Sequence, residues 1–244
     1  ISAGAVAAII GKGVDRKLIK SSPKLLVVEE IDKIIGKLAA IFWDNPSLKV
    51  SLIGVTGTNG KTTTSYLIDH LCRSCGVSSA LFGTLVNRWP GHIEKAINTT
   101  CFADKLQANL AKAVIAGSEI AVMEVSSHAL AQGRVLGCYF SAVVFTNLTQ
   151  DHLDFHSSMK AYFEAKALLF SPPLIDNNSS FAIINIDDYW GEKLSKIIKV
   201  KCWKASLNDE NFNSLDVDLK IKVIEKSFSG VLGIIRTPLG DADF

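Results

Sequence analysis

VSLIGVTGTNGKTT, residues 50–63, decides the fold of this chain. An apolar run breaks at Gly57 into a tight glycine turn and continues as Lys61, Thr62 and Thr63. In such a turn backbone N–H groups approach phosphate oxygens, the following helix presents its positive end, lysine neutralises charge and a threonine hydroxyl ligates magnesium. The pattern therefore predicts a strand, a turn and a helix that bind ATP or GTP. The expected nucleotide-binding residues are Gly57, Thr58, Asn59, Gly60, Lys61, Thr62 and Thr63.

The turn differs from the common P-loop in one position. That pattern has a glycine five positions before Gly60, where this chain has Val55. The shorter pattern G-x-x-G-K-T-T favours a family that uses a shorter turn over a generic P-loop. A glycine turn without a ligand is the alternative, and it leaves the Lys-Thr pair unexplained.

Composition narrows the class of protein. The chain has 244 residues, 48% of them hydrophobic, which is enough for one large or two modest globular domains. Lys and Arg number 26 against 24 Asp and Glu, so no overall charge recruits nucleic acid or a membrane surface. The five cysteines lack the spacing of a disulfide framework, and no signal peptide or spanning segment is evident. We expect a cytoplasmic protein. The pair Cys72 and Cys75 is interpreted as helix packing rather than a metal or redox site.

Strand and helix patterns alternate from residue 49 onward. The expected strands are 50–56, 79–82, 120–125, 142–145, 181–185 and 200–204, and the expected helices are 61–75, 103–116, 159–170 and 190–198. This order predicts an α/β fold with a mostly parallel P-loop-type sheet and flanking helices, and ligands beyond the carboxyl ends of the strands. Residues 215–236 alternate apolar and polar around a turn, which predicts a small antiparallel hairpin.

Residues 1–47 are predicted to belong to part of a smaller α/β domain. Apolar segments at 3–10 and 24–28 precede a helix over 30–42, and its isoleucines, Leu38 and Phe42 fall on one face. In the helix over 61–75 the apolar stripe consists of Leu67, Ile68, Leu71, Cys72 and Cys75. Turn residues at 43–47 predict a domain boundary there.

Glu124 ends the apolar run 120–123. Magnesium bound to ATP prefers hard oxygen ligands, and a carboxylate at the end of a buried strand would supply one. We therefore favour Glu124 as a metal ligand over an ordinary exposed glutamate.

The strand at 142–145 ends in TNLTQDHLDFH, residues 146–156, where acids and histidines crowd a short loop. The spacing of His152 and His156 lacks the glutamate of the zinc motif H-E-x-x-H, so zinc is not favoured. Whether His152 is a magnesium ligand or a structural histidine stays open from its position alone.

Lys166 stands among apolar residues on the helix 159–170. Such surroundings lower the pKa of a lysine, and a neutral amine reacts with carbon dioxide to give a carbamate that binds magnesium. Spacing alone nevertheless favours a surface lysine that extends its ammonium group into water.

Five motifs together resemble the Mur ligases of peptidoglycan synthesis. They are GTNGKTT at 57–63, NTT at 98–100, EVSSH at 124–128, TNLTQDHLDFH at 146–156 and AK at 165–166. EVSSH and NTT are typical of the branch that adds the third amino acid, meso-diaminopimelate or L-lysine, to UDP-N-acetylmuramoyl-L-alanyl-D-glutamate. The resemblance implies three domains. Residues 1–47 would end a UDP-sugar domain, 48–244 would form a truncated central ATP-binding domain, and the C-terminal amino-acid-binding domain would lie outside this chain.

The resemblance also assigns roles to single residues. Lys61, Lys166 and His152 would be catalytic, and Thr62, Glu124, His152 and a carbamylated Lys166 would hold two Mg2+ ions. The residues that would grip the muramoyl dipeptide are Asn98, Thr99, Thr100, Ser126, Gln132 and Arg134. Cys101 and Phe102 depart from the family pattern, where small polar residues are commoner.

The implied reaction is ATP-dependent amide-bond formation through an acyl phosphate, with ATP and a diamino acid as co-substrates. Folylpolyglutamate synthetase is the nearest alternative, since it shares the ATPase architecture and the acyl phosphate route. A nucleotide-binding module without catalysis is the alternative from another class. The truncated chain alone is expected to be inactive.

Overall fold

The computed structural model describes residues 5–14, 24–228 and 230–244. Its helices are α1 (Asp32–Phe42), α2 (Lys61–Ser74), α3 (Ala103–Ile115), α4 (Ser127–Ala131), α5 (Met159–Ala167) and α6 (Tyr189–Ile197), with short 3-10 turns at Pro46–Leu48, Leu168–Phe170 and Asp209–Asn211. Its strands are β1 (Ala8–Gly11), β2 (Leu25–Val28), β3 (Ser51–Thr56), β4 (Ser79–Phe82), β5 (Val86–Trp89), β6 (His92–Lys95), β7 (Ile120–Glu124), β8 (Ala142–Phe145), β9 (Phe181–Asn185), β10 (Lys201–Ser206), β11 (Leu219–Ser227), β12 (Gly230–Thr237) and β13 (Gly240–Asp243).

The main sheet runs in the order β13-β12-β11-β10-β9-β8-β3-β7-β4-β5-β6. The seven strands from β11 to β4 pair in parallel, as the alternation of strands and helices predicts. The antiparallel pair of β11 and β12 confirms the predicted hairpin, although β11 begins at Leu219 rather than 215. The antiparallel strands β5, β6 and β13 were not predicted, because their apolar alternation is short and interrupted.

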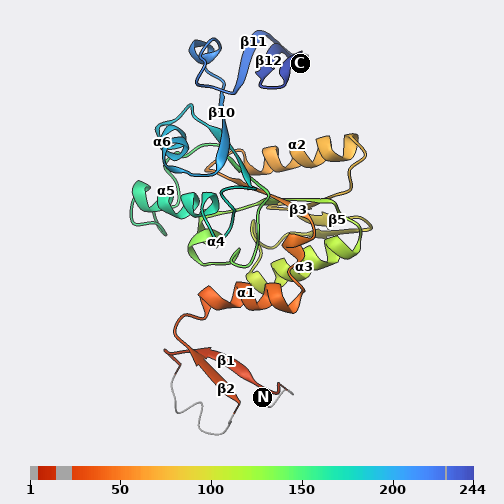
Figure 1. The fold of residues 1–244 in the computed structure, drawn as a ribbon, viewed down its shortest axis with the longest axis vertical. Coiled ribbons are helices and arrows are strands. Elements are labelled where there is room, and N and C mark those ends of the chain that lie inside the picture. Colours follow the sequence, from red (N-terminus) through yellow and green to blue (C-terminus); the bar gives the residue numbers. More distant parts are fainter. Residues whose placement is uncertain (1–4, 15–23, 229) are drawn as a thin grey trace.

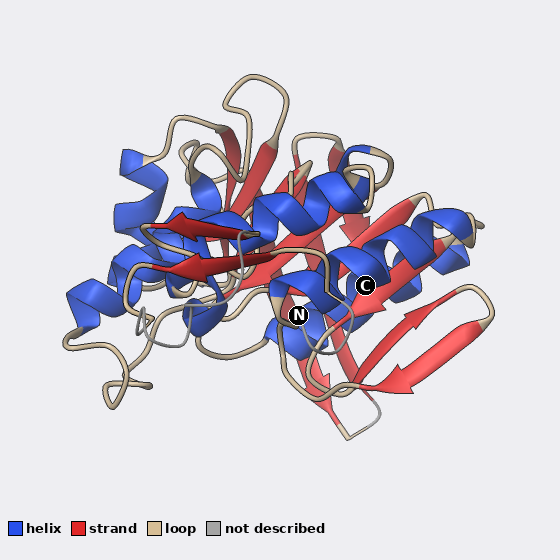
Figure 2. Cartoon of the chain, turned by 90° about the horizontal axis from the view of Figure 1, so that it is seen from below, coloured by secondary structure: helices blue, strands red, loops and turns tan. Residues whose placement is uncertain are grey.

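Helices cover both faces of the sheet (Figure 2). On one face Val55, Leu81 and Val122 form a small core with Tyr66 and Ile68 of α2. On the other face a larger core joins the strands to helices that carry Leu106, Leu110, Tyr162, Phe163 and Leu194, from α3, α5 and α6. Burial of apolar surface on both sides accounts for the nearly continuous apolar runs of the central strands.

Helix α1 packs in a different orientation from the one its apolar face predicts. Its buried residues are Gly36 and Ala40, whereas the side chains of Ile41 and Phe42 are 66% and 79% exposed. A Cβ at Gly36 would lie 2.0 Å from the carbonyl oxygen of Leu136. The small residues therefore let the backbone of α1 approach the segment around Leu136, which turns the larger apolar side chains outward.

Helix α2 contradicts the predicted face in part, since Ile68 packs against the core but its neighbours in the stripe do not all follow. Leu67 and Leu71 are 56% and 62% exposed, while Ser65 and Asp69 are buried. The Asp69 carboxylate accepts a hydrogen bond from Ser79 Oγ at 2.8 Å and forms an ion pair with Arg88. Because a satisfied carboxylate can be buried, this polar pair takes the buried position and Leu67 and Leu71 point away from the sheet. Cys75 is exposed rather than packed.

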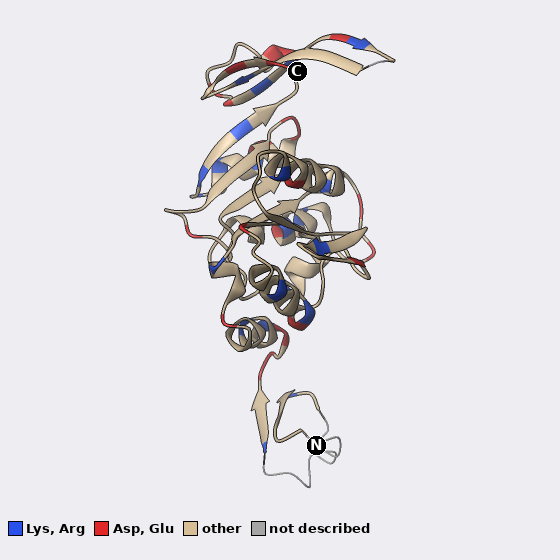
Figure 3. Ribbon diagram, turned by 90° about the vertical axis from the view of Figure 1, so that its right-hand side faces the viewer, with Lys and Arg blue, Asp and Glu red and all other residues tan. Residues whose placement is uncertain are grey.

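The first and last strands of the described chain lie far apart. The parallel pair β1 and β2 lies beyond α1 at one end of the molecule, and β11 and β12 lie at the other (Figure 1). Basic and acidic residues are interspersed on the elements between them (Figure 3). No helix in the described part of the chain is long and apolar enough to cross a membrane.

Candidate functional site

The predicted site residues follow strands that end at the same edge of the sheet. Val55 of β3 pairs with Glu124 of β7, and Thr56 of β3 pairs with Phe145 of β8. The loops after these three strands therefore emerge side by side. They carry the glycine turn, the segment 124–128 and the segment 146–156, so the parallel register brings sequence-distant motifs together.

The glycine turn is held by the loop after β8. Gly57 has a φ of +149°, and a Cβ there would lie 1.9 Å from Thr146 Oγ1. Thr146 Oγ1 donates to the Asn59 carbonyl at 2.6 Å, and Asn59 N–H donates to Asn147 Oδ1 at 3.0 Å. Glycine is thus required at 57 both for conformation and for space. The turn also contacts α5, because the Tyr162 hydroxyl lies 3.2 Å from Thr58 Oγ1.

Two lysines meet at this turn. Lys61 Nζ donates to the carbonyl oxygens of Gly57 and Thr58 at 3.0 and 2.8 Å. Lys166 Nζ donates to the Gly57 oxygen at 2.8 Å and lies 4.6 Å from the centre of the Tyr162 ring. The Lys166 residue is only 1% exposed, so the interpretation as a surface lysine is wrong.

Burial disfavours the charged form of both lysines. It lowers the pKa of Lys166 to about 7, with the positive charge of Lys61 acting in the same direction and Asp151 opposing. Burial also lowers the pKa of Lys61, against the attraction of Glu124 and Asp151. A buried amine with a pKa near neutrality is a reactive group.

Glu124 is 1% exposed and lies directly beside Thr62. Its Oε2 accepts from Thr62 Oγ1 at 2.9 Å and from Thr84 Oγ1 at 3.0 Å, and its Oε1 accepts from Thr84 N–H at 2.9 Å. A Cβ at Gly83 would lie 2.2 Å from Oε1, so the chain comes very close to the carboxylate. The burial contradicts the alternative of an exposed glutamate.

The donor set around Glu124 fits magnesium. A carboxylate and a threonine hydroxyl are both hard oxygen ligands, as that ion prefers. Within the described residues no three His, Cys, Asp or Glu side chains gather in a way that could hold a metal ion. An ion between Thr62 and Glu124 would therefore need nucleotide oxygens and water as its remaining ligands.

His152 lies in a cluster of aromatic rings. It has a φ of +54°, its side chain is 43% exposed, and Asp151 Oδ2 lies 3.5 Å from its Nε2. The ring centre of His128 lies 4.9 Å from that of His152 and 5.6 Å from that of His156. His156 is buried with its Nε2 3.0 Å from Ser127 Oγ. His152 also lies 5.9 Å, between ring centres, from the Tyr162 ring that contacts Lys166.

Five of the six residues expected to bind the dipeptide substrate form one connected group. Thr100 Oγ1 donates to the Glu124 carbonyl at 2.8 Å and accepts from Ser126 N–H at 3.0 Å. Arg134 donates to the Thr100 carbonyl at 3.1 Å and to Gln132 Oε1 at 2.8 Å. Thr99 Oγ1 lies 3.1 Å from Thr84 Oγ1. This group therefore adjoins the Thr62–Glu124 pair. Asn98 precedes it in the chain.

Sequence reasoning missed several residues that hold the site together. Asp188 caps α6, and its Oδ2 accepts from Leu148 N–H at 2.8 Å. Asn185 Nδ2 donates to the Thr146 carbonyl at 2.8 Å. Asn185 ends β9 and Asp188 follows it in the stretch NIDD, whose polar residues at a strand end were the available signal. Thr84 and Tyr162 gave no such signal, since their roles depend on distant partners.

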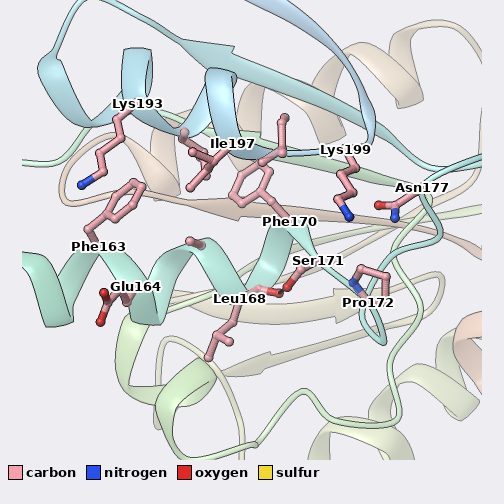
Figure 4. A pocket seen from close by; sticks show the side chains of 13 residues that line it. Phe163, Glu164, Leu168, Phe170, Ser171, Pro172, Asn177, Lys193, Ile197 and Lys199 are labelled. Carbon is pink, nitrogen blue, oxygen red and sulfur yellow. Dashed lines mark hydrogen bonds between the residues drawn. The ribbon is translucent and has the colours of Figure 1, made fainter.

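A separate cavity of about 590 Å3 lies between α5 and α6 (Figure 4). It is lined by Phe163 of α5, by Leu168 of the 3-10 turn that follows α5, and by Ile197 of α6. Lys166 does not line this cavity, because Phe163 and Ala167 face it from another side of α5. The cavity is therefore distinct from the phosphate-binding edge.

Curated relatives match along the whole chain. It is 50% identical over 246 residues to a UDP-N-acetylmuramoyl-L-alanyl-D-glutamate--2,6-diaminopimelate ligase of Prochlorococcus marinus, covering 100% of this chain and 49% of the relative. A ligase of the same name from Trichormus variabilis is 48% identical, with 100% and 48% covered. The chain thus spans about half the length of the curated relatives it matches.

Solved structures also align with most of this chain. The structure of a UDP-N-acetylmuramoyl-L-alanyl-D-glutamate--2,6-diaminopimelate ligase aligns with a TM-score of 0.78 and 29% identity, over 91% of this chain and 45% of that one. Mycobacterium tuberculosis folylpolyglutamate synthase aligns with a TM-score of 0.61 at 14% identity, over 82% and 51%, which shows a shared fold. Residues 55–243 match the family described as Mur ligase middle domain, and the chain therefore belongs to the Mur ligases.

Proposed function

We propose that the intact protein is an ATP-dependent ligase that adds the third amino acid to UDP-N-acetylmuramoyl-L-alanyl-D-glutamate in peptidoglycan precursor synthesis. The names of relatives near 50% identity favour diaminopimelate over lysine as that amino acid. The observation that carries the proposal is the buried Lys166 ammonium group, 2.8 Å from the Gly57 carbonyl in the phosphate-binding turn. A cytoplasmic reaction fits the five cysteines, all of which are free.

The reaction begins when the γ-carboxylate of the D-glutamyl residue attacks the γ-phosphorus of ATP. The bond to the β,γ-bridging oxygen breaks, and an acyl phosphate and ADP result. The amine of the incoming amino acid then attacks the acyl carbon, and a tetrahedral intermediate collapses to the amide, phosphate and a proton. Lys61, at the start of α2, would stabilise charge on the transferring phosphoryl group.

Magnesium would shield the repulsion between the carboxylate and the triphosphate and align the two. Thr62 and Glu124, 2.9 Å apart, would hold one ion beside the phosphates. His152 and a carbamylated Lys166 would hold a second. In forming the carbamate, the neutral Lys166 amine attacks carbon dioxide, a C–N bond forms and one proton is released to solvent. The pKa of about 7 makes much of that amine neutral at physiological pH.

The substrate would lie beside the Thr62–Glu124 pair. Thr100, Ser126, Gln132 and Arg134 form a continuous hydrogen-bonded group there, together with Thr99 through Thr84. The guanidinium of Arg134 suits an acidic ligand. We assign this group, together with Asn98, to the muramoyl dipeptide.

Folylpolyglutamate synthase activity is the competing function, since those enzymes share the fold. The identity of 14% carries no functional argument, and the relatives near 50% bear a different name. A nucleotide-binding module without catalysis is the second alternative. Against it stand the buried lysine and carboxylate at the phosphate-binding turn, which a passive module does not need.

The test is a ligation assay on the intact protein with ATP, Mg2+ and UDP-N-acetylmuramoyl-L-alanyl-D-glutamate. Diaminopimelate and L-lysine are supplied in parallel, and phosphate release and product mass are measured. We expect phosphate and tripeptide product in equal amounts, and none from the Lys61→Ala variant. Glutamate addition to a folate substrate, or nucleotide binding without phosphate release, would contradict the proposal.

A further inference from the structure

Helix α3 begins with an unusual residue. Its N-cap is Phe102, with φ −63° and ψ 154°, and no side chain there bonds the free N–H groups of the first turn. Phenylalanine cannot supply the oxygen that Ser, Thr, Asp or Asn would. The N-caps of α4, α5 and α6 are Ser126, Ser158 and Asp188, and each accepts such a bond. The free energy of unfolding is therefore lower than it would be with Ser, Thr, Asp or Asn at position 102.

The ring of Phe102 is also exposed, with 57% of the residue open to solvent. Large aromatic side chains at such positions gain little from burial. The ring instead faces the guanidinium group of Arg134, whose Cζ lies 4.1 Å from the ring centre. This distance is well within the range of a cation–π contact.

Arg134 is fixed from two other directions. Nη1 donates to the Thr100 carbonyl at 3.1 Å, and Nε donates to Gln132 Oε1 at 2.8 Å. The arginine ion pairs among the described residues involve Arg73, Arg88 and Arg236, so no carboxylate of those residues forms an ion pair with Arg134. A guanidinium group that is held in place and has no acidic partner can donate hydrogen bonds to an oxyanion of a ligand.

We propose that Phe102 is a positioning residue that holds Arg134 in the orientation that receives an oxyanion of the acidic substrate. The inference rests on the proposed function of the group that contains Arg134. Long arginine side chains lose considerable rotamer freedom on binding, and a ring that restricts them beforehand lowers that cost. The loss of a helix cap at this position is then offset by tighter substrate binding.

The test compares three variants of the intact protein by steady-state kinetics and thermal unfolding. Phe102→Ser restores a cap and removes the ring, Phe102→Leu removes only the aromatic face, and Phe102→Tyr retains it. We expect Phe102→Ser to raise the unfolding midpoint and to raise KM for UDP-N-acetylmuramoyl-L-alanyl-D-glutamate about fivefold, a factor typical of a lost cation–π contact, with kcat little changed. Phe102→Leu should raise KM similarly without the gain in stability. Phe102→Tyr should keep the original KM.

A double-mutant cycle with Arg134→Ala shows whether Phe102 acts through that side chain. Phe102→Leu should have no further effect on KM once Arg134 is removed. Asp104→Ala is the matched control, because it removes an acidic residue from the first turn of α3 and so lowers stability while leaving KM unchanged.

Two results would overturn the positioning role. One is an unchanged KM in both Phe102→Ser and Phe102→Leu while the unsubstituted protein ligates normally. The other is a KM that rises only in step with a falling unfolding midpoint, which would assign the ring to packing of α3. Absence of ligation by the unsubstituted protein would instead refute the proposed function, so the two failures are distinguishable.

Discussion

The ammonium groups of Lys61 and Lys166 share one acceptor, the carbonyl oxygen of Gly57, at 3.0 and 2.8 Å. The two ammonium groups therefore lie close together in a largely buried part of the protein. The arrangement favours loss of a proton from one of them, and the pKa of about 7 identifies Lys166 as that residue. The phosphate-binding lysine thus helps to activate the lysine that would be carbamylated.

Lys61→Met tests this coupling. Burial is the larger cause of the lowered Lys166 pKa, and the charge of Lys61 is the next. Removing that charge should raise the pKa of Lys166 partway toward its ordinary value and reduce the carbamate fraction at pH 7. Carbon-13 NMR of protein equilibrated with labelled carbon dioxide measures this fraction. An unchanged fraction would show that burial alone lowers the pKa.

The carbamate should also depend on pH with a definite sign. Only the neutral amine reacts, and with a pKa of about 7 its fraction rises from roughly a tenth at pH 6 to roughly nine-tenths at pH 8. At a constant concentration of dissolved carbon dioxide, carbamate on Lys166 should therefore increase over this interval. An ordinary lysine, with a pKa near 10.5, would show almost none. A labelled-carbon signal that is flat from pH 6 to 8 would argue against the modification.

Lys166→Ala should reduce ligation by the intact protein at least a hundredfold, since one proposed oxygen ligand is lost. Added short-chain carboxylic acids should restore part of the rate by supplying a carboxylate in the vacated space. Lys160→Ala is the control on the same helix, because the Lys160 side chain is 75% exposed. The measurement is phosphate release by Lys166→Ala, by Lys166→Ala with added acid, and by Lys160→Ala. Full activity of Lys166→Ala without added acid would refute the carbamate.

Gly57→Ala should destabilise the protein and weaken nucleotide binding. Its φ of +149° strains any side chain, typically by about 2 kcal/mol, and its Cβ would meet Thr146 Oγ1 at 1.9 Å. Gly76→Ala is the control. It has a φ of +78° but nothing within 4 Å, so it should cost about 1 kcal/mol without affecting nucleotide affinity. Chemical denaturation and calorimetric titration with ATP separate the two effects.

The centre of the fold could be predicted because its signals are local. Apolar runs of four to six residues alternate with helical patterns, and the glycine turn fixes the junction of β3 and α2. The orientation of the helices could not be predicted from the sequence. The apolar stripe of α1 predicts the wrong buried face and that of α2 is only partly correct, because close approach at Gly36 and the buried Asp69 ion pair are tertiary contacts.

The site shows the same division. The motifs identify Lys61, Thr62 and Glu124 by type and position, and the parallel register explains why they meet. The burial of Lys166 was not evident from its spacing, since it depends on Tyr162 and on the turn 109 residues earlier. Asp188 likewise joins α6 to the loop after β8, which is a contact between segments 40 residues apart.

The carboxylate of Glu124 occupies the space that a side chain at position 83 would need. Natural variation there should consequently be as restricted as at the ligand-binding positions themselves, although Gly83 has no side chain that could touch a ligand. Invariance of this glycine among homologous sequences would record the volume of a neighbouring acid, and it should not be mistaken for a sign of direct participation in chemistry.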